Sequence, residues 1–189
     1  MSMVMTAAPA LEPVTLAEAK AQLRIEGSAE DAFISSLIVT SRVQIEAALG
    51  LALISQTWRL TLDDWPDGVI ELSMRPVQSV HSIEVANGSG GATALAPAGY
   101  HVDGRALPPR IILAIDAPPA PEQSAEGIAI TFTAGFGPLA ADVPAPIRQA
   151  LLLLVAHWFE NREPCTGAAS QRTPDAISTL LAPYRMVRL

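Results

Sequence analysis

The sequence has a single cysteine, Cys165, in its 189 residues. A disulfide within the chain needs a second cysteine, and a cysteine-based metal cluster needs several. The composition therefore excludes both of these features. It also favours a reducing compartment, where cysteines stay unpaired.

Basic residues are scarce as well, and lysine is almost absent. The chain has 12 Lys and Arg residues against 19 Asp and Glu, a formal net charge of −7, and Lys20 is its only lysine. A protein that grips nucleic acid over a broad face needs basic residues to neutralise phosphates. The charge balance argues against a DNA-packaging or regulatory protein that holds DNA.

Long hydrophobic runs are also missing. The most apolar stretch, from Ala150 to Phe159, is about half of the ~20 residues that cross a bilayer. The start of the chain has neither the basic residues nor the long apolar stretch of a signal peptide. We therefore expect no signal peptide and no membrane-spanning segment.

The segment from Val143 to Pro164 has apolar residues at helical spacing. Pro144 and Pro146 suit a first helical turn, where a missing N–H costs little, and Pro164 marks an end. The spaced positions are Ile147, Leu151, Leu154, Val155, Trp158 and Arg162, with Leu152 and Leu153 on the opposite side. A helix that is apolar nearly all round is normally buried by its neighbours. The pattern predicts a central helix about 30 Å long, packed by other elements or by other subunits.

Two more helices are predicted before residue 55. Thr15 and Glu18 form a capping-box pattern, and Gly27 ends the short helix behind it. A longer helix ending at Gly50 follows, with this apolar stripe: Ile34, Leu37, Ile38, Ser41, Ile45, Ala48 and Leu49. A last short helix starts at Thr173 with a hydroxyl cap, a proline and an acid, and ends before Pro183, after a polar loop at residues 165–172.

Between residues 56 and 137 the period changes to that of β-strands. Trp58, Leu60 and Leu62 alternate with polar residues. Further strands are predicted at residues 69–72, 77–86, 100–103, 110–115 and 127–133, with a glycine-rich hairpin tip at 87–91 and a proline-rich loop at 117–124.

These segments predict an α+β fold with about four helices and an inserted small antiparallel β domain. The helical core covers residues 14–55 and 138–182, and the β domain covers residues 56–137. Residues 1–13 have small side chains, two prolines and little pattern. We expect them to form an unstructured or partner-dependent N-terminal arm.

The three histidines do not form a metal-binding pattern. His81, His101 and His157 lie far apart in the sequence. His101 and Asp103 could face the same way on a strand, but two ligands do not make a zinc site. His157 is interpreted as a core or interface residue.

Catalytic patterns are not found either. Asp63, Asp64 and Asp67 surround a proline–glycine turn, where aspartate serves turn chemistry. The glycines of residues 88–91 are not followed by a lysine, and no serine stands where a nucleophile elbow needs one. The sequence therefore predicts no catalytic residue, no metal and no cofactor.

Several motifs spread over most of the chain carry a resemblance to a known family. They are Val14-Thr15-Leu16-Ala17-Glu18-Ala19-Lys20 with Leu23-Arg24; Asp31 with Ile34, Leu37 and Ile38; Gln56-Thr57-Trp58; Pro76-Val77 with Ser79-Val80; Phe132-Thr133-Ala134-Gly135-Phe136-Gly137; Val143-Pro144 with Ile147; and His157-Trp158-Phe159-Glu160-Asn161-Arg162-Glu163. In order and spacing they resemble the phage head–tail connector (adaptor) proteins, in the branch shared by siphophage prophages and gene transfer agents.

The resemblance implies a helical connector core with an inserted β domain. It implies a homo-oligomeric ring, usually a dodecamer, below the portal protein in the virion neck, made in the bacterial host cytoplasm. The ring would extend the channel through which double-stranded DNA passes without specific binding, with no membrane involved. It would also offer a platform to the stopper or another tail-side neck protein.

The resemblance also implies that the C-terminal tail, residues 183–189, docks on the portal. The implied portal-binding residues are Tyr184, Arg185, Met186, Val187, Arg188 and Leu189. A ring needs contacts that close by rotation, and we expect the central helix and the helix before Gly50 to supply them. The ring-interface residues predicted on this basis are Leu151, Leu152, Leu154, Val155, Trp158, Ile38 and Ile45.

Two alternatives remain. Another neck component, such as a stopper or tail-completion protein, would be more purely β than this sequence. A small β-rich enzyme would need polar residues that converge in a pocket.

Overall fold

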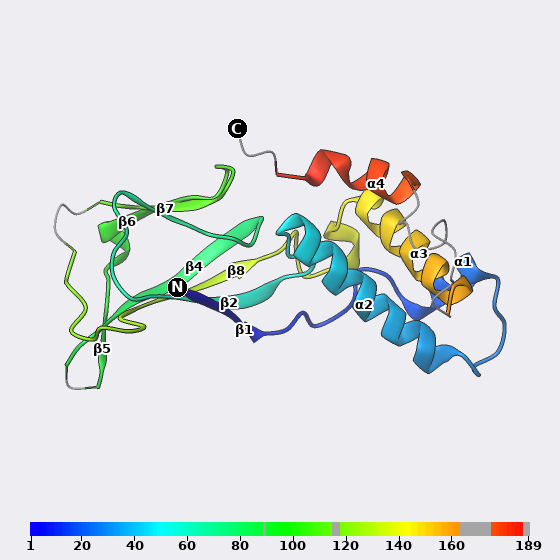
Figure 1. The fold of residues 1–189 in the computed structure, drawn as a ribbon, viewed down its shortest axis with the longest axis horizontal. Helices are drawn as coiled ribbons and strands as arrows, with labels where there is room; N and C mark the ends of the chain where they lie inside the picture. Colours follow the sequence, from blue (N-terminus) through cyan, green and yellow to red (C-terminus); the bar gives the residue numbers. More distant parts are fainter. Residues whose placement is uncertain (89, 115–117, 163–174, 187–189) are drawn as a thin grey trace. The chain divides into compact units, whose positions relative to one another are not determined.

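The computed structural model describes residues 1–88, 90–114, 118–162 and 175–186. The chain divides into two compact units, which we call the β unit (Met1–Ala10 and Gly50–Phe136) and the helical unit (Leu11–Leu49 and Gly137–Leu189). Figure 1 shows strands in the first and the four α-helices in the second. The described residues thus confirm the α+β class, with two antiparallel sheets.

Helix α1 (Leu16–Leu23) begins at the predicted capping box. The Thr15 amide donates to Glu18 Oε2 at 2.7 Å, and the Glu18 amide donates to Thr15 Oγ1 at 3.2 Å. The helix ends before the predicted Gly27, because Arg24 takes the left-handed conformation with φ 57°. Its amide and that of Ile25 bond back to the last turn, which closes the helix.

Helix α2 (Asp31–Leu49) buries the predicted stripe except for Ala48, which is exposed. Gly50 follows it with φ 61°, as a terminating glycine does. Among the described helices, α2 alone has the length and composition to cross a membrane. It packs on α3 and buries Arg42 and Glu46, as a core helix of a folded unit does.

Arg42 forms an ion-pair group that the sequence analysis did not predict. Arg42 Nε donates to Glu12 Oε2 and Arg42 Nη1 donates to Glu46 Oε2, both at 2.7 Å. Burial by itself lowers the pKa of Arg42, but the hydrogen bond to Glu12 and the attraction of both carboxylates outweigh it, so the pKa is raised. The group ties the segment before α1 to α2.

Helix α3 (Ala145–Glu160) is the predicted central helix. Pro144 caps it and Pro146 lies in its first turn, as predicted. It ends at Glu160 after 16 residues and is therefore about 24 Å long rather than 30. Helices α1, α2 and α4 (Asp175–Leu181) pack against it, so much of its apolar surface is covered by the chain itself. Residues 163–174, including Pro164, the expected loop at 165–172 and the expected cap at Thr173, lie outside the described residues.

The larger sheet of the β unit has the order β1-β2-β8-β4-β5, and all neighbours are antiparallel. Its strands are β1 (Ser2–Ala7), β2 (Gln56–Leu62), β4 (Val77–Ala86), β5 (Ala92–Ala94) and β8 (Ile128–Ala134). The smaller sheet has the order β3-β7-β6, with β3 (Val69–Glu71), β6 (Tyr100–Asp103) and β7 (Arg110–Leu113). Every strand predicted from the sequence is present, and β1 and β5 were missed.

The core of the β unit contains residues from both sheets. The larger sheet contributes Leu60, Ile83, Ile130 and Phe132, and the smaller one contributes Ile70 and Ile111. All of these side chains are almost completely buried. The two sheets therefore share one hydrophobic core.

The prediction of an unstructured arm is wrong for residues 2–7, which form β1. This strand lies at the edge of the larger sheet, and among the described strands it pairs with β2 alone. Of its side chains only Met3 is half-buried, and the other five are exposed. An edge strand held mainly by backbone hydrogen bonds needs no alternating hydrophobic pattern, which explains why the sequence gave no sign of it.

Candidate assembly surfaces

Most of the predicted ring-interface residues lie inside the helical unit. Leu151, Val155, Ile45, Ile38 and Leu154 have 0%, 0%, 2%, 3% and 4% of their surface exposed. Leu152 and Trp158 are half-buried. A side chain covered by its own chain leaves almost no surface for a neighbour, and the ring interface itself stays a prediction.

The solvent-facing side of α2 carries no charged residue. We call it the outer face of α2, and it consists of Ala32, Ser35, Ser36, Val39, Thr40, Val43, Gln44, Ala47 and Ala48, all exposed. Val39 is 42% exposed and Val43 is 51% exposed. An exposed helix face normally carries charged and polar residues. This one is a candidate contact surface.

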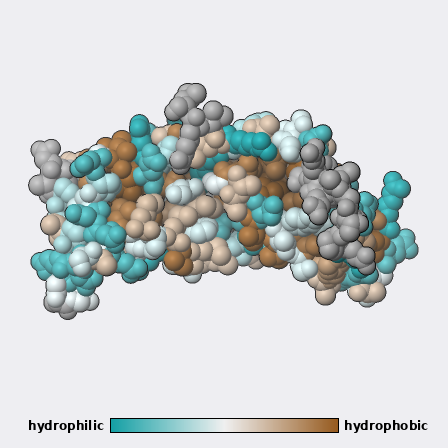
Figure 2. All heavy atoms as spheres, in the orientation of Figure 1, coloured by the Kyte–Doolittle hydropathy of each residue, from teal (hydrophilic) through white to brown (hydrophobic). Residues whose placement is uncertain are grey.

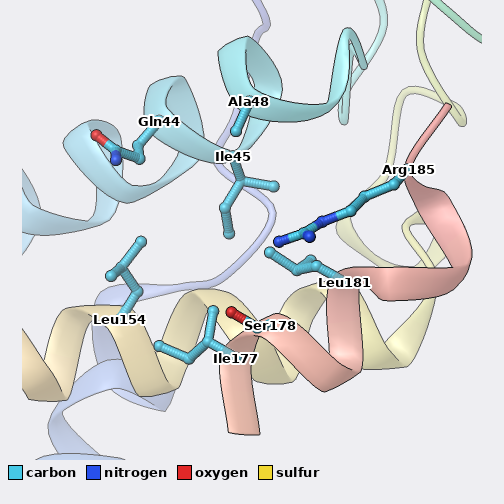
Figure 3. Close-up of a pocket in the computed structure, with 8 residues that line it drawn as sticks. All are labelled: Gln44, Ile45, Ala48, Leu154, Ile177, Ser178, Leu181 and Arg185. Atoms are coloured by element: carbon cyan, nitrogen blue, oxygen red, sulfur yellow. The ribbon is translucent and has the colours of Figure 1, made fainter. Parts of the chain in front are cut away.

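A pocket of about 140 Å³ opens between α2, α3 and α4. Its lining is Gln44, Ile45, Ala48, Leu154, Ile177, Ser178, Leu181 and Arg185. Figure 3 shows Arg185 reaching from the residues after α4 back towards Ile45 and Leu181. The structure thus brings Ile45 and Leu154, predicted for the ring interface, together with Arg185, predicted for portal binding.

The first part of the predicted tail folds onto the helical unit. Residues Ala182–Tyr184 form a turn of 3-10 helix, and the Arg185 amide donates to the Ala182 carbonyl at 3.2 Å. Within the described residues, the Arg185 guanidinium has no hydrogen-bond or ion-pair partner. Val187, Arg188 and Leu189 lie outside the described residues.

The aromatic motif at the end of α3 forms a stacked cluster with the start of α2. The Arg162 guanidinium lies 4.7 Å from the ring centre of Phe33 and 4.3 Å from that of Phe159. Arg162 Nη2 also lies 3.1 Å from Glu30 Oε2. Arginine stacks well on aromatic rings, so this part of the motif joins two helices of the unit.

The motif around Gly135 has a packing role in the β unit. Gly135 has φ 142°, and a Cβ atom there would come within 2.7 Å of the backbone of Ile54 and Ser55. Its amide donates to the Pro76 carbonyl at 2.9 Å, and Gln78 Nε2 donates to its carbonyl at 2.8 Å. The close approach requires glycine.

Asp63, Asp64 and His81 have structural partners. Asp63 Oδ1 accepts a hydrogen bond from the Glu126 amide at 3.0 Å, which is the main cause of the lowered pKa of Asp63. Asp64 Oδ1 accepts from the Trp65 amide at 2.8 Å, as in a turn. His81 Nε2 and Thr133 Oγ1 lie 2.7 Å apart on neighbouring strands.

No group of acids, histidines or cysteines in the described part of the chain could hold a metal ion. Figure 2 shows hydrophobic residues reaching the surface at several separate places on the face in view, between hydrophilic ones.

The comparison with protein families decides what kind of protein this is. The sequence matches the family described as head completion protein over residues 12–187. The chain belongs to the head completion protein family. The comparison with curated proteins gave no match.

Solved structures similar to this head completion protein come from particles of a gene transfer agent (GTA). A chain in the neck of an empty GTA particle, computed with C6 symmetry, has a TM-score of 0.86 and 28% identity. A chain in the virion of a native GTA particle has a TM-score of 0.85 and 29% identity. A chain in the neck of a native GTA particle, computed with C12 symmetry, has a TM-score of 0.79 and 28% identity. Each comparison covers 100% of this chain and 97% of the other. The resemblance stated from the sequence motifs is confirmed.

Two features of this head completion protein escaped the sequence analysis. The Arg42–Glu46 pair lies four residues apart in a helix whose one other charged residue is Asp31, and this spacing is the signal that could have pointed to it. The outer face of α2 could have been found by asking which side of the helix lacks charge. The most hydrophobic side of α2, by contrast, is buried within the chain.

Proposed function

We propose that this head completion protein is a structural protein of the virion neck, where it acts as a head–tail connector (adaptor). The observation that carries this proposal is the similarity over the whole chain to chains in the neck and virion of GTA particles, at 28–29% identity. Similarity over full length covers both units of this chain, so the resemblance is not limited to a common sheet or helix pair.

The proposed protein forms a ring of identical subunits, a dodecamer, below the portal. The similar neck structures were computed with C6 and with C12 symmetry, and a ring of twelve identical subunits has both. In a ring each subunit uses two different surfaces, one for each neighbour. Of the residues predicted at the ring interface, Leu152 and Trp158 keep enough exposed surface to contribute to it.

The proposed partners are the portal protein on the head side and the stopper or another neck protein on the tail side. The tail that begins near Pro183 docks on the portal through Tyr184, Arg185, Met186, Val187, Arg188 and Leu189. Double-stranded DNA passes through the ring without specific binding. The net charge of −7 supports this, since an acidic chain has little affinity for phosphates.

We assign no catalytic activity, metal or cofactor to the protein. Asp63 and Asp64 take part in turns and loop contacts, His81 lies against Thr133 of the neighbouring strand, and Asp103 pairs with Arg110. The role is therefore architectural: the chain supplies surfaces for assembly.

Removal of the gene from a producing strain tests the proposal. Heads filled with DNA but lacking tails should accumulate, and electron microscopy of the particles should show them. Normal tailed particles without the protein would contradict the proposed function.

A binding experiment separates the connector from the alternative neck roles. The purified chain, mixed with portal protein alone, should form a ring complex visible by negative-stain microscopy. Native mass spectrometry of that complex should give twelve copies if the C12 symmetry of the similar neck applies here. If binding required another neck protein to be present first, the stopper or tail-completion role would replace the connector role.

A further inference from the structure

We infer that a second copy of this chain packs on the outer face of α2. This inference rests on the proposed ring and names one of the surfaces through which its subunits meet. It assigns the contact between copies to the exposed residues Val39 and Val43. The residues predicted from the sequence, Ile38 and Ile45, are buried on the opposite side of the same helix.

The absence of charge on this face is the first argument. The sequence has 12 basic and 19 acidic residues, yet none of them stands among the nine exposed positions along the 19-residue helix. Protein surfaces commonly carry about a quarter to a third charged residues. Charged residues are depleted where a surface is buried against a partner.

The exposed valines are the second argument. Val39 and Val43 are 42% and 51% exposed and lie one helical turn apart, so they form one apolar patch. Alanine and serine flank them at Ser35, Ser36, Ala47 and Ala48. Small flanking side chains let another element approach closely, because the distance between packed helices depends on the side chains at the contact.

Net charge supports a second copy as the occupant. Two copies that each carry −7 repel one another, and they meet at the lowest cost where neither presents a charge. A basic partner would be drawn to acidic residues, and DNA would need Arg or Lys. The outer face of α2 offers neither, whereas it suits a neighbour of the same net charge.

The face continues into the pocket between α2, α3 and α4. Gln44 and Ala48 belong to the outer face and also line that pocket. A neighbour packed on the end of this face would therefore lie next to the pocket, beside Gln44 and Ala48.

The test is Val43→Glu, which puts one charge in the centre of the face. The matched control is Gln149→Glu, which adds the same charge at an exposed position of α3. Each variant replaces the natural chain in producing cells, and mass spectrometry counts its copies in purified particles. We expect Val43→Glu to reduce these copies by about tenfold or more, which corresponds to about 1.4 kcal/mol of contact free energy. The control should match the wild-type chain.

Thermal unfolding of the isolated chains shows whether a loss of copies comes from a destabilised fold rather than from a lost contact. We expect both variants to keep the wild-type Tm, because both side chains are exposed in the single chain. A lowered Tm for Val43→Glu alone would mean that this chain itself covers the face, and would overturn the inference. Normal incorporation of Val43→Glu, or an equal loss with Gln149→Glu, would overturn it too and leave the proposed function intact. Absence of the wild-type chain from particles would instead refute the proposed function.

Discussion

Arg148 donates a hydrogen bond through Nη2 to Glu18 Oε1, although the two residues lie 130 positions apart in the sequence. Glu18 is also the acid of the capping box at the start of α1. Arg148 Nε donates in addition to the Pro13 carbonyl at 3.0 Å. One carboxylate and one guanidinium therefore join the start of α1, the segment before it and α3.

Replacing Arg148 with methionine should lower the free energy of unfolding by about 1 kcal/mol, since it removes two charge-assisted hydrogen bonds at a partly exposed site. Urea denaturation of the full chain measures this. In a double-mutant cycle, Arg148→Met and Glu18→Gln should be non-additive. Arg105→Met, at an exposed position, is the control and should have little effect. Purely additive effects of Arg148→Met and Glu18→Gln would show that the pair does not act together.

Stability should depend on the ionisation of Glu18. The hydrogen bond from the Thr15 amide is the main cause of the lowered pKa of Glu18; the Thr15 hydroxyl and Arg148 lower it further, and burial opposes them. A pKa lowered by folding means that the stabilisation is complete above the pKa of the unfolded chain, about 4.3. It is lost as the pH falls through the folded value.

The corresponding experiment compares Glu18→Gln with the wild type from pH 7 to pH 3. The variant should be less stable at pH 7, and the difference should shrink on acidification. Glu26→Gln, which removes one charge at an exposed position of the same unit, serves as the control. A difference that stays constant with pH would show that the effect of Glu18→Gln does not come from the charge of Glu18.

Local signals in the sequence were enough to predict most of the elements. The Thr15–Glu18 capping box works over three residues, and the alternation in β2 works over seven, so neither needs knowledge of the rest of the chain. The edge strand β1 and the three-residue strand β5 have mostly or wholly exposed side chains. β1 pairs with β2, which is distant in the sequence, and β5 pairs with β4 in a hairpin. Neither kind of pairing requires a periodic hydrophobic pattern.

The surface proposed for contact between copies was harder to predict for a physical reason. Hydrophobic periodicity identifies the side of a helix that is most apolar, and the chain uses that side for its own core, as at Ile38, Ile45 and Leu151. A contact with another copy has to use what remains outside. On α2 the exposed side differs from an ordinary surface by its lack of charge around Val39 and Val43. This lack can be recognised only once the structure has shown which side is buried.

Gly135→Ala should destabilise the β unit strongly. A methyl group there would approach the Ile54 and Ser55 backbone to 2.7 Å, and φ 142° is unfavourable for alanine. We expect a loss of more than about 2 kcal/mol. Gly68→Ala is a matched control, because Gly68 also has positive φ, 94°, but nothing lies within 4 Å of its Cβ position. It should cost about 1 kcal/mol. Equal losses in urea denaturation would mean that backbone conformation, rather than close packing, determines the requirement for glycine.

The proposed portal contact of the tail can be tested at Arg185. Its side chain is exposed and has no ion-pair partner in the described part of the chain, so reversing its charge should leave the Tm unchanged. The tail from residue 184 onward contains two arginines and no acid. If its charge contributes to docking, Arg185→Glu should weaken binding to purified portal protein by roughly tenfold, or 1.4 kcal/mol.

Two further variants complete the portal experiment. Arg105→Glu makes the same charge reversal at an exposed position of the β unit and should bind the portal like the wild type. Truncation after Arg185 removes residues 186–189 while leaving α4 and the turn at Ala182–Tyr184 in place, and it should weaken binding at least as much as Arg185→Glu. Normal binding of both tail variants would refute docking through the tail. Loss of binding by Arg105→Glu as well would show that the portal responds to overall charge, since this position is far from the tail in sequence.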